Sequence, residues 1–106
     1  MPKYLWQVSY NAEGTKGVLK DGGSKRRAVA EKAIKAVGGK LEAFYFAFGE
    51  ADVYLIADMP DNVSVAAASM AINASGAVRI KTTVLLTLEE IDAATKKSVS
   101  YRPPGQ

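Results

Sequence analysis

The chain of 106 residues is 48% hydrophobic and 24% charged, with a formal net charge of +3, which is the size and composition of one globular domain. It contains no cysteine and no histidine, which excludes disulfides, thiolate nucleophiles, Ser-His-Asp triads and the common zinc and haem sites. No apolar run approaches the roughly 20 residues of a membrane span and the first residues lack the pattern of a signal peptide, so we expect a cytoplasmic protein without a metal or cofactor.

The first half of the chain reads as a strand followed by helical segments. Residues 3–10 place three aromatic side chains and Val8 at alternate positions, which predicts a strand. Asn11 and Ser24 are residue types that cap helices, and each precedes a stretch that we predict to be helical. Gly38-Gly39 ends the second of these helices, because glycine adopts the left-handed backbone conformation without strain.

The second half of the chain contains two further helix starts. Asp61 or Asn62 is predicted to cap an alanine-rich helix, whose small side chains allow close packing on a sheet. Thr87 and Glu90 have the spacing of a capping box at the start of a last helix. The predicted strands are residues 3–10, 41–48, 53–58 and 78–86, and the predicted helices are residues 12–20, 25–37, 63–74 and 88–97.

This βαββαβ order is typical of the ferredoxin-like sandwich, an α+β fold with a four-stranded antiparallel sheet and helices on one face. The last helix is an addition at the C-terminal end of that pattern. We expect a single domain over residues 1–97 and a flexible tail over residues 98–106, which include Pro103-Pro104-Gly105.

Residues 41–58 are predicted to form the central hairpin, with its turn at Gly49-Glu50-Ala51-Asp52. A strand with one wet face alternates apolar and polar residues, but here both faces are largely apolar. We therefore predict that helices cover one face of the sheet and that a second copy of the protein covers the other. Strict alternation puts Leu41, Ala43, Tyr45 and Ala47 on one side of the first strand and Glu42, Phe44, Phe46 and Phe48 on the other.

Several short motifs have a familiar order and spacing. They are Ser24-Lys25-Arg26-Arg27, Gly38-Gly39-Lys40, Phe44-Tyr45-Phe46, Gly49-Glu50-Ala51-Asp52, Met59-Pro60-Asp61 and Val78-Arg79-Ile80-Lys81-Thr82. With them the chain resembles the GYD-domain family of small bacterial proteins over most of residues 3 to 95. The namesake Gly-Tyr-Asp triplet is only partly present, since Ala51 stands where the tyrosine would be. The resemblance implies a dimeric α/β barrel in which two ferredoxin-like sheets face each other, and it implies no particular chemistry.

A pocket between two facing sheets is the favoured candidate site. The first strand would pair with the fourth, which places Gln7 and Ser9 beside Arg79 and Lys81. An apolar pocket with a few converging polar groups is the usual form of a small-ligand site, and the two cations favour an anionic or carbonyl ligand. The competing interpretation is that Arg79 and Lys81 only keep an edge strand soluble. Tyr45, Asp52 and Tyr54 complete the predicted ligand-binding set.

Two alternative functions remain open from the sequence. A cofactor-independent enzyme in the same cavity would use Asp52, a tyrosine or Lys81, although an aspartate in a tight turn more often caps the turn. A phosphate or nucleic-acid binder would use the basic helix from Lys25 to Lys35, although the small net charge and the lack of a nucleic-acid motif favour a solvated helix face. The sequence therefore favours a homodimer or higher oligomer with a small ligand, no membrane partner and no nucleic acid.

Overall fold

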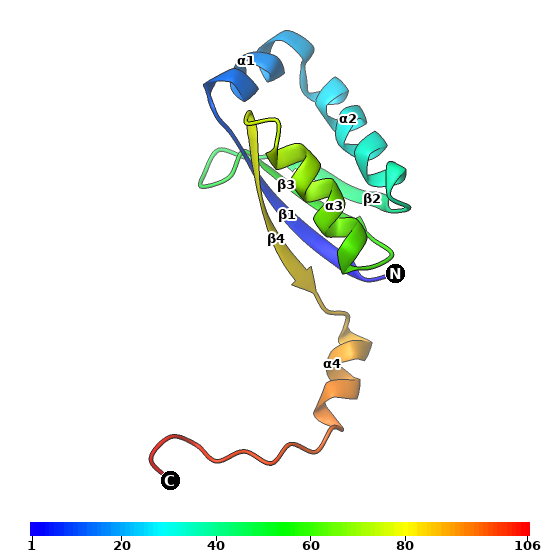
Figure 1. Cartoon of the computed structure of the whole chain (residues 1–106), viewed down its shortest axis with the longest axis vertical. Coiled ribbons are helices and arrows are strands. Elements are labelled where there is room, and N and C mark those ends of the chain that lie inside the picture. The colour runs from blue at the N-terminus through cyan, green and yellow to red at the C-terminus, as the bar shows by residue number, and fades with distance from the viewer.

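In the computed structural model, which describes residues 1–106, an antiparallel sheet of four strands carries three helices on one face (Figure 1). The strand order is β2-β3-β1-β4, so the two central strands are β3 and β1. This α+β architecture is consistent with the predicted ferredoxin-like fold. The elements are β1 (Lys3–Tyr10), α1 (Ala12–Asp21), α2 (Gly23–Ala36), β2 (Lys40–Phe46), β3 (Val53–Asp58), α3 (Asn62–Asn73), β4 (Val78–Leu85) and α4 (Leu88–Thr95).

Three of the four helices begin at side-chain caps, as their sequences predict. The Asn11 side chain accepts a hydrogen bond from the Gly14 N–H, and the Asp61 side chain accepts one from the Ser64 N–H. Thr87 begins α4 with both hydrogen bonds of a capping box. Each cap satisfies one of the N–H groups that a helix leaves free at its first turn.

The start of α2 differs from the prediction. Ser24 does not cap this helix, because the chain turns at Gly22 with φ +80° and α2 begins at Gly23 without a side-chain cap. The left-handed conformation at Gly22 separates α1 from α2 in place of a capping serine. At the other end of α2, Gly38 has φ +84° and terminates the helix as predicted.

Alternate side chains of β1 lie on opposite faces of the sheet. Its side chains Tyr4, Trp6 and Val8 are buried under the helices, whereas Leu5 and Gln7 between them are half-buried on the other face. The largest fully buried side chains, which include Ile34 of α2 and Met59 after β3, also lie on the helix-covered side. The core is therefore a single layer between the sheet and its helices.

β2 departs from strict alternation. Its pairing with β3 shifts between Leu41 and Ala43, where Glu42 is the extra residue of a β-bulge. The prediction that one uninterrupted alternation runs along residues 41–48 is therefore wrong, and the strand also ends earlier, at Phe46. The extra residue of a bulge shifts the in-and-out alternation by one position. The apolar residues before the bulge and those after it therefore face the same side of the sheet. Leu41, Phe44 and Phe46 face the helices, and Glu42, Ala43 and Tyr45 face away from them.

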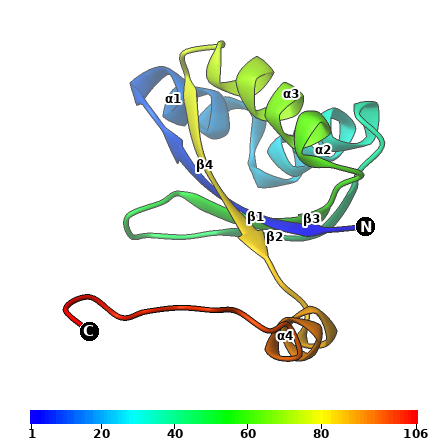
Figure 2. The ribbon, with the colours of Figure 1, turned by 60° about the horizontal axis from the view of Figure 1, so that its bottom comes forward.

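The C-terminal arm, which we define as residues 86–106, extends beyond the end of the sheet (Figure 1). Figure 2 shows α1, α2 and α3 together on one face of the sheet, with α4 and the last residues apart from them. α4 has no buried residue, and Leu88 is 81% exposed. The arm raises the radius of gyration to 16.9 Å, against about 13 Å for a compact chain of 100 residues. None of the helices is both long enough and apolar enough to span a membrane.

Candidate ligand site on the open face of the sheet

The open face is the side of the sheet that is turned away from α1, α2 and α3. No element of the same chain covers it, and its residues are either exposed or half-buried by their own neighbours in the strands. The residues of this face are Lys3, Leu5, Gln7 and Ser9 of β1, Lys40, Glu42, Ala43 and Tyr45 of β2, Tyr54, Ile56 and Asp58 of β3, and Arg79, Lys81, Thr83 and Leu85 of β4.

One row of polar and aromatic residues crosses all four strands of the open face. Gln7 lies opposite Tyr54 on one side and opposite Lys81 on the other, and Tyr54 lies opposite Tyr45. Side chains opposite each other in neighbouring strands have Cβ atoms about 5 Å apart. The row therefore aligns two phenols, an amide and an ammonium group, which together can bind a carboxylate or a carbonyl oxygen.

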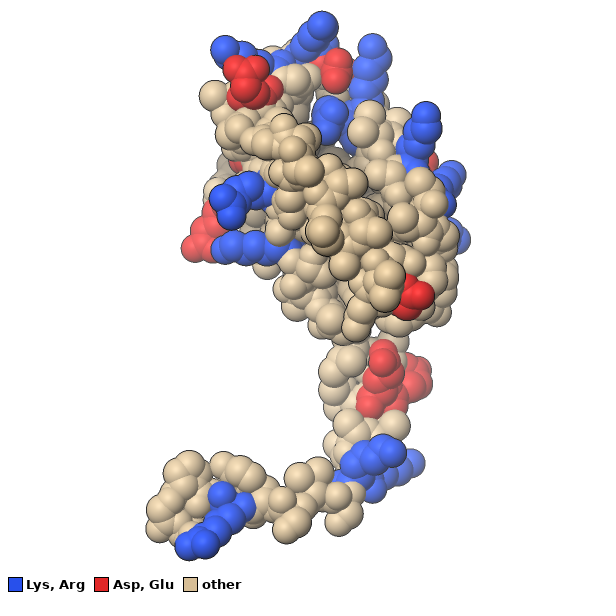
Figure 3. Space-filling model, in the orientation of Figure 1, with Lys and Arg blue, Asp and Glu red and all other residues tan.

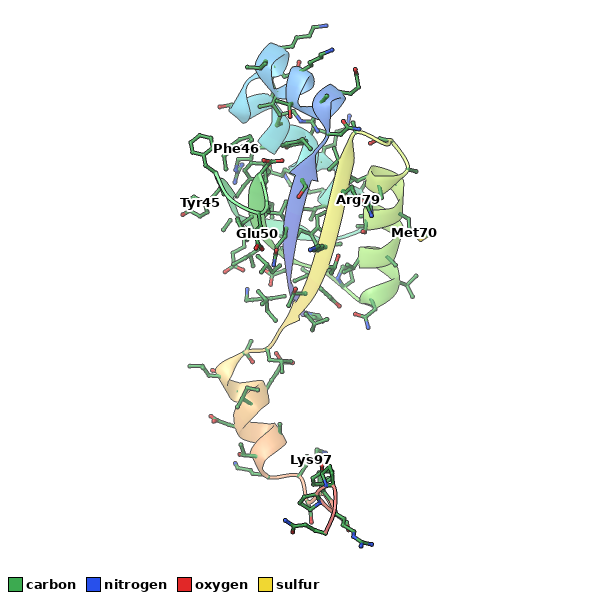
Figure 4. The ribbon with its side chains drawn as sticks, turned by 90° about the vertical axis from the view of Figure 1, so that its left-hand side faces the viewer. Tyr45, Phe46, Glu50, Met70, Arg79 and Lys97 are labelled. Carbon is green, nitrogen blue, oxygen red and sulfur yellow. The ribbon has the colours of Figure 1, made fainter.

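Ser9 and Arg79 lie next to this polar row, and they are opposite each other in the β1–β4 pairing. Figure 4 shows Tyr45 and Arg79 toward opposite edges of the sheet, so the polar groups extend over its whole width. Arg79 and Lys81 are exposed and have no ion-pair partner. The structure thus brings six of the seven predicted ligand-binding residues onto one face; their role in binding stays a prediction.

An apolar row borders the polar row. Ala43, Ile56 and Leu5 lie opposite one another across β2, β3 and β1, and Thr83 continues the row on β4. Ala43, Ile56 and Leu5 are half-buried in the single chain. This row gives the open face an apolar strip that another surface can cover.

A triad of charged residues lies at the end of the open face, on the far side of the apolar row from the polar row. Lys3 Nζ donates hydrogen bonds to Glu42 Oε2 at 2.8 Å and to Asp58 Oδ1 at 2.9 Å. The hydrogen bond to Glu42 and then that to Asp58 raise the pKa of Lys3 above its usual value. This triad does not follow from the spacing of residues in the sequence, because Glu42 reaches Lys3 only through the bulge in β2.

Asp52 is the one predicted site residue that the structure places at the end of the strands. Its Oδ2 atom accepts a hydrogen bond from the Tyr10 N–H at 2.8 Å, and its own N–H donates to the Val8 carbonyl oxygen at 2.8 Å. Its carbonyl oxygen accepts a hydrogen bond from the Ala47 N–H at 2.8 Å. These bonds tie the β2–β3 turn to the end of β1. The sequence favours a structural role for this aspartate as a cap of its own turn, but its carboxylate binds the Tyr10 N–H of β1 instead.

Most basic side chains of α2 are exposed to solvent, and Arg26 is the one that is half-buried. Lys and Arg gather over α1 and α2 (Figure 3). Within α2, Glu31 lies 3.7 Å from Arg27 and 3.9 Å from Lys35, in ion pairs one helical turn apart. Exposed pairs of this kind contribute little to stability. This pattern matches a solvated helix face better than a phosphate site.

Fold and open face together define a small α+β protein with a four-stranded antiparallel sheet that has one face covered by helices and one uncovered. The family model of the GYD domain matches residues 4–95. The chain therefore belongs to the GYD domain family, as the sequence motifs indicate. Comparison with curated proteins and with solved structures gives no match.

Proposed function

We propose that the protein is a homodimer that binds a small anionic or carbonyl ligand between two open faces. In this arrangement the open face of one protomer is covered by the open face of its partner, and the two polar rows line the cavity between them. The single observation that carries the proposal is the pair of neighbouring rows, one apolar and one polar, across an uncovered sheet. Contiguous apolar surface of this kind usually marks an interface, and the commonest oligomer is a two-fold dimer.

The charges of the open face support an anionic ligand. Both carboxylates on this face, Glu42 and Asp58, already accept hydrogen bonds from Lys3. Arg79 and Lys81 have no such partner. Covering the face with a second copy would take these two cations out of bulk water, which strengthens their attraction for a carboxylate. Tyr45 and Tyr54 would add hydroxyl groups for orientation.

The C-terminal arm also supports a second copy. Leu88 and Ile91 form an apolar stripe on α4 and are 81% and 45% exposed. A short isolated helix is marginal in water and depends on packing of its apolar side. The arm has no such surface in its own chain, so we expect it to pack against the partner.

The dimer is tested by placing a charge in the apolar row. Wild type is expected to sediment as a dimer, and Ile56→Asp as a folded monomer, because the aspartate would be buried without a partner at the interface. Met70→Asp is the matched control, since Met70 is exposed on α3, away from the open face. A wild-type protein that stays monomeric at high concentration in analytical ultracentrifugation would contradict the proposal.

The ligand is tested by comparing salicylate with its uncharged amide, salicylamide. In a titration followed by amide NMR shifts, salicylate is expected to move resonances of Gln7, Tyr54 and Lys81, and to bind more tightly than salicylamide. Lys81→Gln should remove this preference, while Lys96→Gln on the arm should leave it unchanged. Equal binding of both compounds to wild type would contradict a site for anions.

A further inference from the structure

A second cavity lies on the other side of the sheet, under the helices. α2 packs over β2 and α3 packs over β4, and the cavity lies between the two helices and the sheet. The cavity has a volume of about 70 Å³, and twelve of its thirteen lining residues are hydrophobic. This is about half of the roughly 150 Å³ of an apolar cavity that takes up benzene, so the cavity has room for a ligand of a few heavy atoms.

Small side chains on the helix create this space. Ala30 and Ala33 are the residues that α2 contributes to the wall, together with Val29 and Arg26, and Ile72 is the contribution of α3. Larger residues at the two alanine positions would fill the cavity. The pattern of residues on α2 therefore leaves a volume open that ordinary packing would close.

The floor of the cavity holds a buried donor without an acceptor. Trp6 lines the cavity from β1, its side chain is 1% exposed, and its Nε1–H has no hydrogen-bond partner. A buried tryptophan usually finds a partner for this group. A buried polar group without a partner calls for an explanation, and a ligand oxygen is one that fits the cavity.

The only charged residue in the lining is Arg26, in the first turns of α2. Its side chain is half-buried and has no ion-pair partner, whereas its neighbour Arg27 is exposed and lies 3.7 Å from Glu31. A guanidinium beside apolar walls favours an anion, because the guanidinium is always charged and is only weakly hydrated.

We infer that this cavity binds a short-chain carboxylate. The apolar body of the ligand lies between α2 and α3, an oxygen accepts the hydrogen bond of the Trp6 Nε1–H, and Arg26 neutralises the negative charge. This site is separate from the open face, since the sheet lies between the two, and it does not depend on a dimer.

Trp6 is the only tryptophan, so its indole N–H gives one resonance in a ¹⁵N–¹H spectrum. The probes are isobutene, acetone and acetate, which share a small branched shape and differ in the oxygen and the charge. We expect acetone to shift the indole resonance and to bind about tenfold more tightly than isobutene, because isobutene offers no acceptor. Equal affinity for these two probes would overturn the role of Trp6.

Two kinds of variant test separately the charge of Arg26 and the volume of the cavity. Arg26→Gln should weaken acetate binding about fivefold without changing acetone binding, and Arg27→Gln should change neither. Ala33→Leu should abolish binding of all three probes by filling the cavity, with far-UV circular dichroism as the check on folding. Lys81→Gln on the open face should have no effect here.

Two results would overturn the proposal. The first is an indole resonance that no probe shifts in wild type. The second is acetate binding that Arg26→Gln and Arg27→Gln weaken equally, since Arg26 would then act only through the general charge of α2. Arg26 is only half-buried, so Arg26→Gln is expected to fold normally. This variant therefore still tests the proposal if Ala33→Leu does not fold.

Discussion

The two faces of the sheet are built from the same strands but are completed in different ways. On the covered face, Leu55 is 2% exposed beneath the helices of its own chain. On the open face, its neighbour Ile56 is only half-buried, and no element of the chain covers it. Period-two alternation in a strand supplies an apolar surface to both sides at once. The comparison teaches that this chain encodes two apolar layers and supplies helices for only one of them.

The sharpest test of this comparison is truncation of the two neighbours on β3. Leu55→Ala is expected to lower the free energy of unfolding by about 2–5 kcal/mol, because it leaves a cavity in a closed core. Ile56→Ala removes a similar volume from a half-buried position, so its effect on the isolated protomer should be about 1 kcal/mol. Urea denaturation followed by circular dichroism measures both values.

The dependence of these two stability losses on protein concentration then distinguishes the two faces. The loss from Leu55→Ala should be the same at low and high concentration, whereas the loss from Ile56→Ala should grow with concentration, because association stabilises only the folded state. If the Ile56→Ala loss is independent of concentration, the open face is not an interface.

Much of the covered face follows from local sequence signals. The bounds of β1 and β3, the caps Asn11 and Asp61, and the capping box at Thr87 were all predicted, because each depends on residues within one turn or one strand. The pairing of β1 with β4 followed from the fold type, and it placed Gln7 correctly beside Lys81.

The features that were missed depend on contacts between distant segments. The bulge at Glu42 belongs to the register of β2 against β3, which does not appear in the spacing of residues 41–48. The cavity beside Trp6 depends on how far apart α2 and α3 lie on the sheet. Sequence periodicity indicates which side of a helix faces inward, but not whether two helices meet.

The attachment of the helical layer is tested at two glycines of α1. A Cβ atom at Gly14 would collide with the Ala77 carbonyl oxygen and with the Tyr10 ring, whereas a Cβ atom at Gly17 would meet nothing. Gly14→Ala should therefore destabilise the protein by about 1–3 kcal/mol, and Gly17→Ala should stabilise it by about 0.5–1 kcal/mol. Thermal denaturation of the two variants measures both changes in stability. If both changes have the same sign, the close contact with the Ala77 carbonyl oxygen does not affect stability.

The cap of α4 tests whether the arm belongs to the cooperative core. Thr87→Ala removes a capping-box hydrogen bond and should weaken α4 by about 1 kcal/mol. Because α4 has no buried residue, the unfolding midpoint of the isolated protomer should change little, while amide exchange in residues 88–95 becomes faster. Thr87→Ser, which keeps the hydroxyl, is the control. A large fall in the midpoint at low concentration would show that α4 packs on its own protomer.

The smallest expected effect concerns the cap of α3, which lies on the covered side. The hydrogen bonds from Ser64 lower the pKa of Asp61 below its usual value of 3.8. A carboxylate with a lowered pKa stabilises the folded state fully above the unfolded value of 3.8, and this contribution is lost as the pH falls through the lower folded-state pKa. Asp61→Asn keeps a side-chain acceptor for the helix but removes the titration. Wild type should therefore be slightly more stable than Asp61→Asn at neutral pH, and the difference should disappear in acid, as urea midpoints at both pH values would measure. A difference that stays constant with pH would mean that the charge of Asp61 does not contribute to the cap, and that the covered face depends on packing alone at this helix.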